Sequence, residues 1–162
     1  MDLDHLNSLP EWNDHKLLKR MYEGEEWKMK KQMDAAEALY NKWREIFPLV
    51  ESYCDTLQDS VDYEHSEQNK ELIYQNLFIV APKIIGAAGT SSYVLKMENA
   101  SVIRHNCREL MEQVKFAALV GAGEDKYAEA IEEEMDKFRE YFRSWVATFV
   151  KDSDEDEWGL YV

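Results

Sequence analysis

Residues 29–57, MKKQMDAAEALYNKWREIFPLVESYCDTL, carry the clearest structural signal in this chain. Their apolar residues recur every three or four positions without losing phase, which is the period of one face of an α-helix. Pro48 lies inside the pattern, but the pattern resumes in register after it, so we expect a kink and not an end. The predicted helix buries Met29, Met33, Ala36, Tyr40, Trp43, Phe47, Val50, Cys54 and Leu57.

Three further segments repeat the helical period. We expect a turn near residues 62–66 with Ser66 as an N-cap, a break over 86–92 capped by Thr90, Ser91 or Ser92, and an end at 121–123. The predicted buried faces are Ile73, Leu77, Val80, Ala81, Ile84 and Ala88; then Tyr93, Met97, Ala100, Ile103, Cys107, Leu110, Met111, Val114 and Ala118; and last Tyr127, Ile131, Met135, Phe138, Phe142, Trp145 and Phe149.

The chain begins with a shorter helical signal. Ser8, followed by Pro10 and Glu11, has the spacing of a capping box, and Gly24 separates this segment from the first long helix. The sequence therefore predicts an all-α, antiparallel four-helix bundle with long, proline-kinked helices and an additional short N-terminal helical segment. We expect one domain over residues 1–150, followed by an acidic tail, residues 151–162, with an apolar tip.

Charge narrows the set of partners. The 162 residues hold 33 acidic and 19 basic side chains, and the net charge of -14 repels nucleic acid and anionic lipid. The most apolar run, residues 77–88, spans about twelve residues and contains Lys83, whereas a membrane helix needs about twenty apolar residues. Without a signal peptide, we expect a cytoplasmic protein that binds neither membranes nor nucleic acid. Cys54 and Cys107 indicate reduced core thiols, with a disulfide as the alternative.

Motifs for chemistry are few, and the sequence predicts no metal site, no cofactor and no catalytic residue. One alternative is a small-ligand or anion site at the 83–92 turn, because backbone N–H groups and hydroxyls at a helix N-terminus bind anions. Its residues are Lys83, Thr90, Ser91, Ser92 and Arg104.

His105 supports a remoter alternative. A surface histidine on a helical bundle, with Arg108 three residues later, resembles a histidine-phosphotransfer domain, and the resemblance implies phosphoryl transfer through His105. That family has a small residue after the base, whereas this chain has Glu109, which repels a phosphate. The other interpretation is a surface His105–Glu109 pair.

The leading hypothesis is a non-enzymatic bundle that acts through protein–protein contacts and self-associates, with a dimer favoured. Surplus apolar residues off the buried stripes predict the interface: Trp27, Leu72, Phe78 and Ile79. The tail pairs a run of acids with the apolar tip Trp158, Leu160, Tyr161 and Val162. This tip either binds a protein partner or folds back onto its own bundle.

Overall fold

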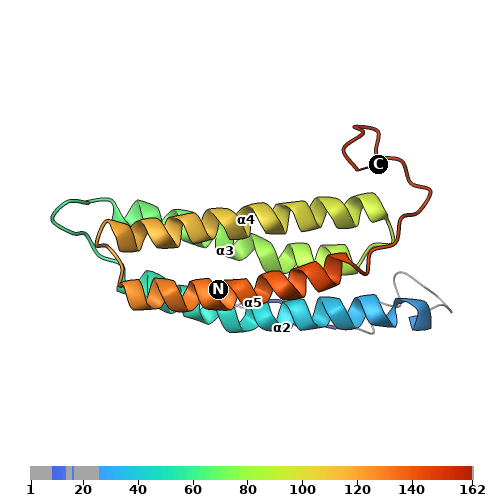
Figure 1. The fold of residues 1–162 in the computed structure, drawn as a ribbon, viewed down its shortest axis with the longest axis horizontal. Helices are drawn as coiled ribbons and strands as arrows, with labels where there is room; N and C mark the ends of the chain where they lie inside the picture. The colour runs from blue at the N-terminus through green and yellow to red at the C-terminus, as the bar shows by residue number, and fades with distance from the viewer. Residues whose placement is uncertain (1–8, 14–15, 17–25, 162) are drawn as a thin grey trace, which may run out of the picture.

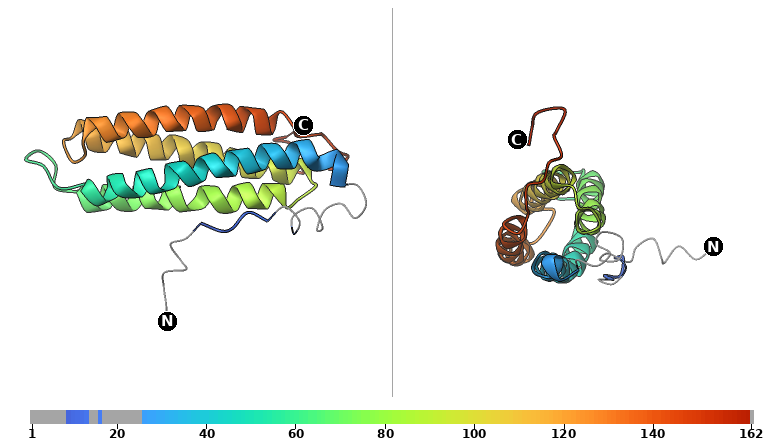
Figure 2. Two further views of the ribbon diagram at one scale, coloured as in Figure 1. Left: turned by 90° about the horizontal axis from the view of Figure 1, so that it is seen from below. Right: turned by 90° about the vertical axis from the view of Figure 1, so that its right-hand side faces the viewer.

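The structure of this protein is a computed structural model that describes residues 9–13, 16 and 26–161. The described part folds as an all-α, antiparallel four-helix bundle, which confirms the predicted fold class (Figure 1). Each helix packs against the next in the chain, and the last helix closes the ring against the first (Figure 2). The helices are α2 (Glu26–Thr56), α3 (Ser66–Ala88), α4 (Tyr93–Leu119) and α5 (Asp125–Val146).

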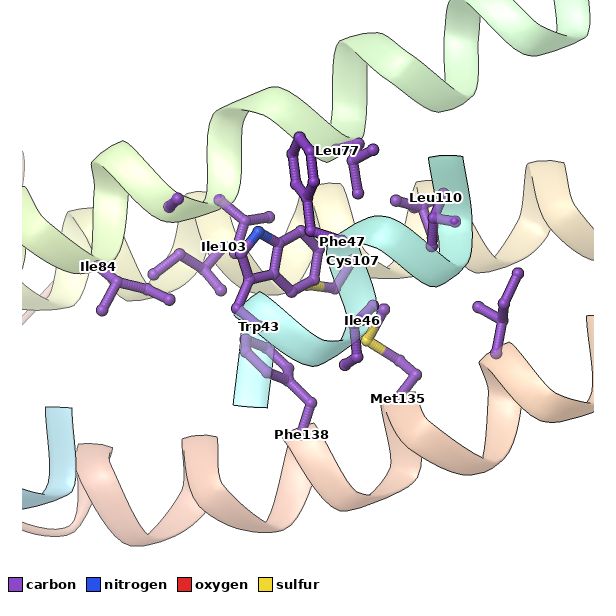
Figure 3. Packing of buried hydrophobic residues seen from close by; sticks show 14 of the residues in the cluster. Trp43, Ile46, Phe47, Leu77, Ile84, Ile103, Cys107, Leu110, Met135 and Phe138 are labelled. Carbon is purple, nitrogen blue, oxygen red and sulfur yellow. The ribbon is translucent and has the colours of Figure 1, made fainter. Parts of the chain in front are cut away.

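The buried core follows the predicted stripes in most positions. The exceptions among the predicted residues are half-buried: Met29, Tyr93, Met97, Met111, Ala118, Tyr127, Phe142 and Phe149. Leu39, Ile46 and Tyr53 of α2 are fully buried although the predicted stripe did not include them. Helices α2 and α3 continue through Pro48 and Pro82, and the register of the apolar residues around Pro48 predicted this for α2. Figure 3 shows Phe138 of α5 reaching toward Trp43 of α2, and their ring centroids lie 5.2 Å apart. Such apolar burial is the dominant favourable term in folding. The largest fully buried side chains are Trp43, Trp145, Tyr40, Tyr53, Leu39, Ile46, Ile73, Leu77, Ile84, Ile103, Leu110 and Ile131.

The first connection differs from the prediction at Ser66. Ser66 is the first residue of α3 and not its N-cap, because Asp59 in the preceding loop performs the capping. The Asp59 carboxylate accepts hydrogen bonds from the Ser66 hydroxyl at 2.6 Å and the Ser66 N–H at 3.0 Å. These two bonds lower the pKa of Asp59, since they favour its charged form.

The remaining connections are tight. Helix α3 includes Gly86, so the predicted break shortens to residues 89–92, and Ser92 caps α4 by accepting a hydrogen bond from the Leu95 N–H. Helix α4 ends before the 121–123 segment, as predicted. There Gly121 adopts a φ of 77°, which is favourable mainly for glycine. Gly123 leaves no room for a Cβ atom because the Tyr53 ring packs directly against it.

The N-terminal helical segment falls mostly outside the described residues, as do Ser8 and Gly24. Residues 9–13 have no regular secondary structure, and Asn13 Oδ1 accepts a hydrogen bond from the Lys16 N–H at 2.9 Å. That contact is the geometry of an N-cap, so it places a cap at Asn13. Trp12 packs on Tyr40 of α2 with ring centroids 5.4 Å apart, which attaches residues 9–13 to the bundle.

Both cysteines are buried and free, which confirms the interpretation as core thiols over the disulfide alternative. Burial raises the pKa of Cys54 to about 12 and also raises the pKa of Cys107. Across the described ranges, no helix is long and apolar enough to cross a membrane.

Candidate functional site: an arginine-rimmed groove

Helices α4 and α5 enclose a groove of about 460 Å³ between them. This volume lies within the range of about 300 to 1,000 Å³ that is usual for ligand pockets. The floor of the groove is apolar, and it continues the inner faces of both helices. Its floor residues are Ile103, Cys107 and Met111 of α4 and Met135, Phe138 and Phe142 of α5.

Four arginines form the rim of the groove. Arg104 and Arg108 lie on α4, and Arg139 and Arg143 lie on α5. A spacing of four residues places the two arginines of each helix on the same face, one turn apart. The whole chain contains only six arginines and has a net charge of -14. The groove therefore concentrates positive charge in a strongly acidic protein.

The charge of the rim is only partly balanced by neighbouring acids. Arg139 pairs with Asp136 at 3.0 Å and Arg143 pairs with Glu140 at 3.5 Å, both on exposed surface where ion pairs contribute little. Arg104 and Arg108 are exposed and form no ion pair with any residue that the structure describes. One acid, Glu112, also lines the groove. The α4 side of the rim is thus the part with guanidinium groups available for a ligand.

The groove is suited to binding a ligand that is both anionic and apolar. Guanidinium groups bind carboxylates through paired hydrogen bonds and stack on aromatic rings, while the floor accepts apolar side chains. Its one thiol, Cys107, is buried and its pKa is raised, so it stays protonated and is a poor nucleophile. Within the described part of the chain, no three His, Cys, Asp or Glu side chains gather as metal ligands would.

The structure separates the residues predicted for the anion site. Arg104 lines the groove, while Lys83 is half-buried on α3 and Thr90, Ser91 and Ser92 form the α3–α4 turn. The N–H of Tyr93, the first residue of α4, donates to Asp152 Oδ2 at 2.9 Å. A carboxylate from the chain's own tail therefore occupies this helix N-terminus, where an external anion was predicted.

His105 lies on the exposed surface of α4, and the neighbouring Glu109 is half-buried. Neither residue lines the groove. No ion pair joins them within 4.0 Å among the described contacts, so the predicted His105–Glu109 pair is not formed.

The predicted apolar interface is divided between two faces of α3. Leu72 and Ile79 are 43% and 37% exposed, and their spacing of seven residues puts them on one outer face. Phe78 is 39% exposed but turns toward α2, where its ring packs edge-on against Phe47 at 5.6 Å. The side chain of Trp27 lies outside the described residues.

The tail is anchored to the bundle, but its apolar tip is not buried. Asp152 contacts the N-terminus of α4, and the Tyr161 hydroxyl lies 2.6 Å from Ser101 Oγ of the same helix. Between these anchors, Trp158 is 88% exposed and Leu160 is 72% exposed. The tail therefore folds back onto its own bundle at Asp152 and Tyr161, while Trp158 and Leu160 stay exposed. Val162 lies outside the described residues.

Lys96 of α4 is a buried charge that was not among the residues predicted from the sequence. Its side chain is 3% exposed, and its Nζ donates a hydrogen bond of 2.9 Å to the backbone oxygen of Ala87 near the C-terminus of α3. Burial lowers the pKa of Lys96 to about 8. The available signal was its position, four residues before Ala100 and seven before Ile103, on the buried stripe.

The groove residues were not predicted as a group from the sequence. Arg104 alone was predicted, as part of the anion site at the 83–92 turn. The signal was the four-residue spacing of arginines beside an apolar stripe on two helices. The fold and the groove together define an antiparallel helical bundle with an apolar groove that is lined by four arginines. No protein-family model, curated protein or solved structure matches this chain.

Proposed function

We propose that this protein is a non-enzymatic binding module that acts through protein–protein contacts, including contacts between its own copies. Its binding surface is the groove between α4 and α5, and the ligand class is an acidic protein segment that carries apolar side chains. One observation carries the proposal: four of the six arginines of an acidic chain surround one apolar groove.

The composition of the groove supports a protein segment as its ligand. Arginine and aromatic residues dominate the energetics of protein interfaces, and Phe138 and Phe142 lie in the floor beside the four guanidinium groups. Acidic side chains on the ligand would neutralise Arg104 and Arg108, which have no ion pair among the described residues. Complementary charge also raises the rate of association.

A small anionic, aromatic dye tests the groove without requiring knowledge of the partner. We expect 1-anilinonaphthalene-8-sulfonate to bind saturably, one dye per chain, since its sulfonate fits the arginines and its rings fit the floor. The variant Arg108→Glu should weaken binding by about tenfold or more, which corresponds to about 1.4 kcal/mol. Fluorescence titration measures the dissociation constant.

Arg44→Glu provides the matched control, because it makes the same change of charge at an exposed position of α2. It should leave dye binding nearly unchanged. Equal loss of binding in both variants would show that the dye responds only to net charge. That result, or the absence of saturable binding to the wild-type chain, would contradict the proposal.

A further inference from the structure

We infer that the groove of one copy receives the C-terminal tip of a second copy, with Trp158 and Leu160 seated on the apolar floor. This inference rests on the proposed binding role of the groove, and it names the occupant. The tip is defined as residues 154–161, which join four acids to the exposed apolar side chains and Tyr161.

The tip is ordered before any partner arrives. The Asp156 carboxylate accepts hydrogen bonds from the backbone N–H groups of Trp158, Leu160 and Tyr161 at 3.0, 2.8 and 3.0 Å. Gly159 completes the turn with a φ of 68°. A segment that is already folded loses little conformational entropy when it binds, which favours affinity.

The tip presents its apolar side chains to solvent. Trp158 and Leu160 are among the most exposed large apolar residues of the described chain, at 88% and 72%. Figure 1 and the right-hand view of Figure 2 show the tail standing away from the side of the bundle, next to the first turns of α4. A rigid turn that holds a tryptophan outward has the form of an interface anchor, since tryptophan is enriched among residues that dominate binding.

Charge favours this pairing over other contacts between copies. Each copy has a net charge of -14, so most surfaces of two copies repel each other. The groove gathers four arginines, and the tip carries Asp154, Glu155, Asp156 and Glu157 directly before Trp158. The groove is thus the surface to which an acidic tip of the same chain is attracted.

The anchoring of the tail favours a second copy over the chain's own groove. The contacts of Asp152 with Tyr93 and of Tyr161 with Ser101 hold both ends of the tail on α4, and in this state Trp158 and Leu160 face solvent. Ser101 lies one helical turn before Arg104, so tip and groove are neighbours along one helix. Two copies related by a two-fold axis can therefore exchange tips, each over the groove of the other.

Light scattering and sedimentation velocity on the full chain test the inference. We expect the mass of the wild-type protein to rise with concentration toward twice the 19.1 kDa of one chain. A tip variant, Trp158→Ala with Leu160→Ala, and a groove variant, Arg108→Glu with Arg139→Glu, should each remain monomeric. All four positions are in the tail or on the groove rim, so circular dichroism should be unchanged, and so should the melting temperature at a concentration at which the wild type is monomeric.

The decisive measurement mixes the two variants. The tip variant retains a groove and the groove variant retains a tip, so the mixture should regain a complex of one copy of each. A control, Leu72→Ser with Ile79→Ser on the outer face of α3, should associate as the wild type does. A mixture that stays monomeric, or association that is lost in the α3 control and kept in the tip variant, would overturn the inference.

The dye titration separates failure of this inference from failure of the proposed function. If the chain is monomeric at all concentrations but Arg108→Glu still weakens dye binding selectively, the second copy is not the occupant and the groove remains a binding site. If the selective loss of dye binding is also absent, both proposals fail.

Discussion

The buried Lys96 leads to a quantitative prediction about stability. Its pKa is lowered from 10.5 to about 8 by burial alone, and one pKa unit equals about 1.4 kcal/mol, so burial disfavours the charged form by about 3 kcal/mol. Replacement by methionine keeps an unbranched side chain and removes this charge. It also removes the hydrogen bond to Ala87, which is worth about 1 kcal/mol. We therefore expect Lys96→Met to raise the free energy of unfolding by about 1 to 2 kcal/mol at pH 7.

The pH dependence of this gain has a definite sign. In the unfolded chain Lys96 titrates near its ordinary pKa of 10.5, above its folded pKa of about 8. Between these two values the unfolded state binds more protons, so wild-type stability rises with pH. Below pH 8 the penalty of the buried charge is complete. The advantage of Lys96→Met should therefore be constant below about pH 8 and should shrink as the pH rises toward 10.

Urea unfolding, followed by far-ultraviolet circular dichroism at pH 7 and pH 10, measures this difference. The comparison of two variants at each pH cancels the titration of other groups. Lys115→Met, at a half-exposed position of the same helix, should change stability by no more than about 0.5 kcal/mol. A loss of stability in Lys96→Met at pH 7, or a gain that is equal at both pH values, would refute the reasoning.

Three further predictions concern glycines and the tip. Gly86→Ala should stabilise the protein by about 0.5 to 1 kcal/mol, because Gly86 lies inside α3 and its Cβ would meet only an ordinary contact at 3.5 Å. Gly123→Ala should destabilise the protein by about 1 to 3 kcal/mol, because the added Cβ collides with the Tyr53 ring. Thermal unfolding measures both glycine variants, and an equal shift of the melting temperature in the two would contradict this packing. Backbone hydrogen bonds lower the pKa of Asp156, so the tip should stay ordered above the ordinary pKa of an aspartate and should loosen as the pH falls through the lowered pKa of Asp156. An NMR titration that places the pKa of Asp156 at or above about 3.9, the ordinary value, would contradict the turn.

Helix periodicity was sufficient to predict the fold from the sequence. A helix that buries one face must repeat its apolar residues every three or four positions, and the stripes through Trp43, Leu77 and Ile103 do so without interruption. Pro48 was placed inside a helix for the same reason, and the structure confirms it. These features depend on neighbours within one helix, which is the range over which a single sequence is informative.

The groove could not be predicted from the spacing of residues within one helix. The groove depends on how α4 and α5 are rotated against each other, because that rotation brings Arg104 of α4 and Arg143 of α5 to the lining of one groove. Likewise, the N-terminus of α4 was predicted to bind an external anion, and the anion proved to be Asp152, which lies 59 residues away in the sequence. Both outcomes are set by tertiary contacts that the spacing of residues along a single helix does not contain.

The first half of α4 combines three functions that the proposed experiments can separate. Lys96 lies in the core and affects stability, Ser101 anchors the tail, and Arg104 begins the rim of the groove. Effects of substitutions at sites without shared contacts add, whereas substitutions in one network do not. The gain from Lys96→Met should therefore be the same in the wild type and in the groove variant. If the effects of Lys96→Met and of the groove variant on stability were coupled instead, loss of association in the groove variant would reflect a change in the bundle itself. The tip variant alone would then decide whether copies exchange their tips.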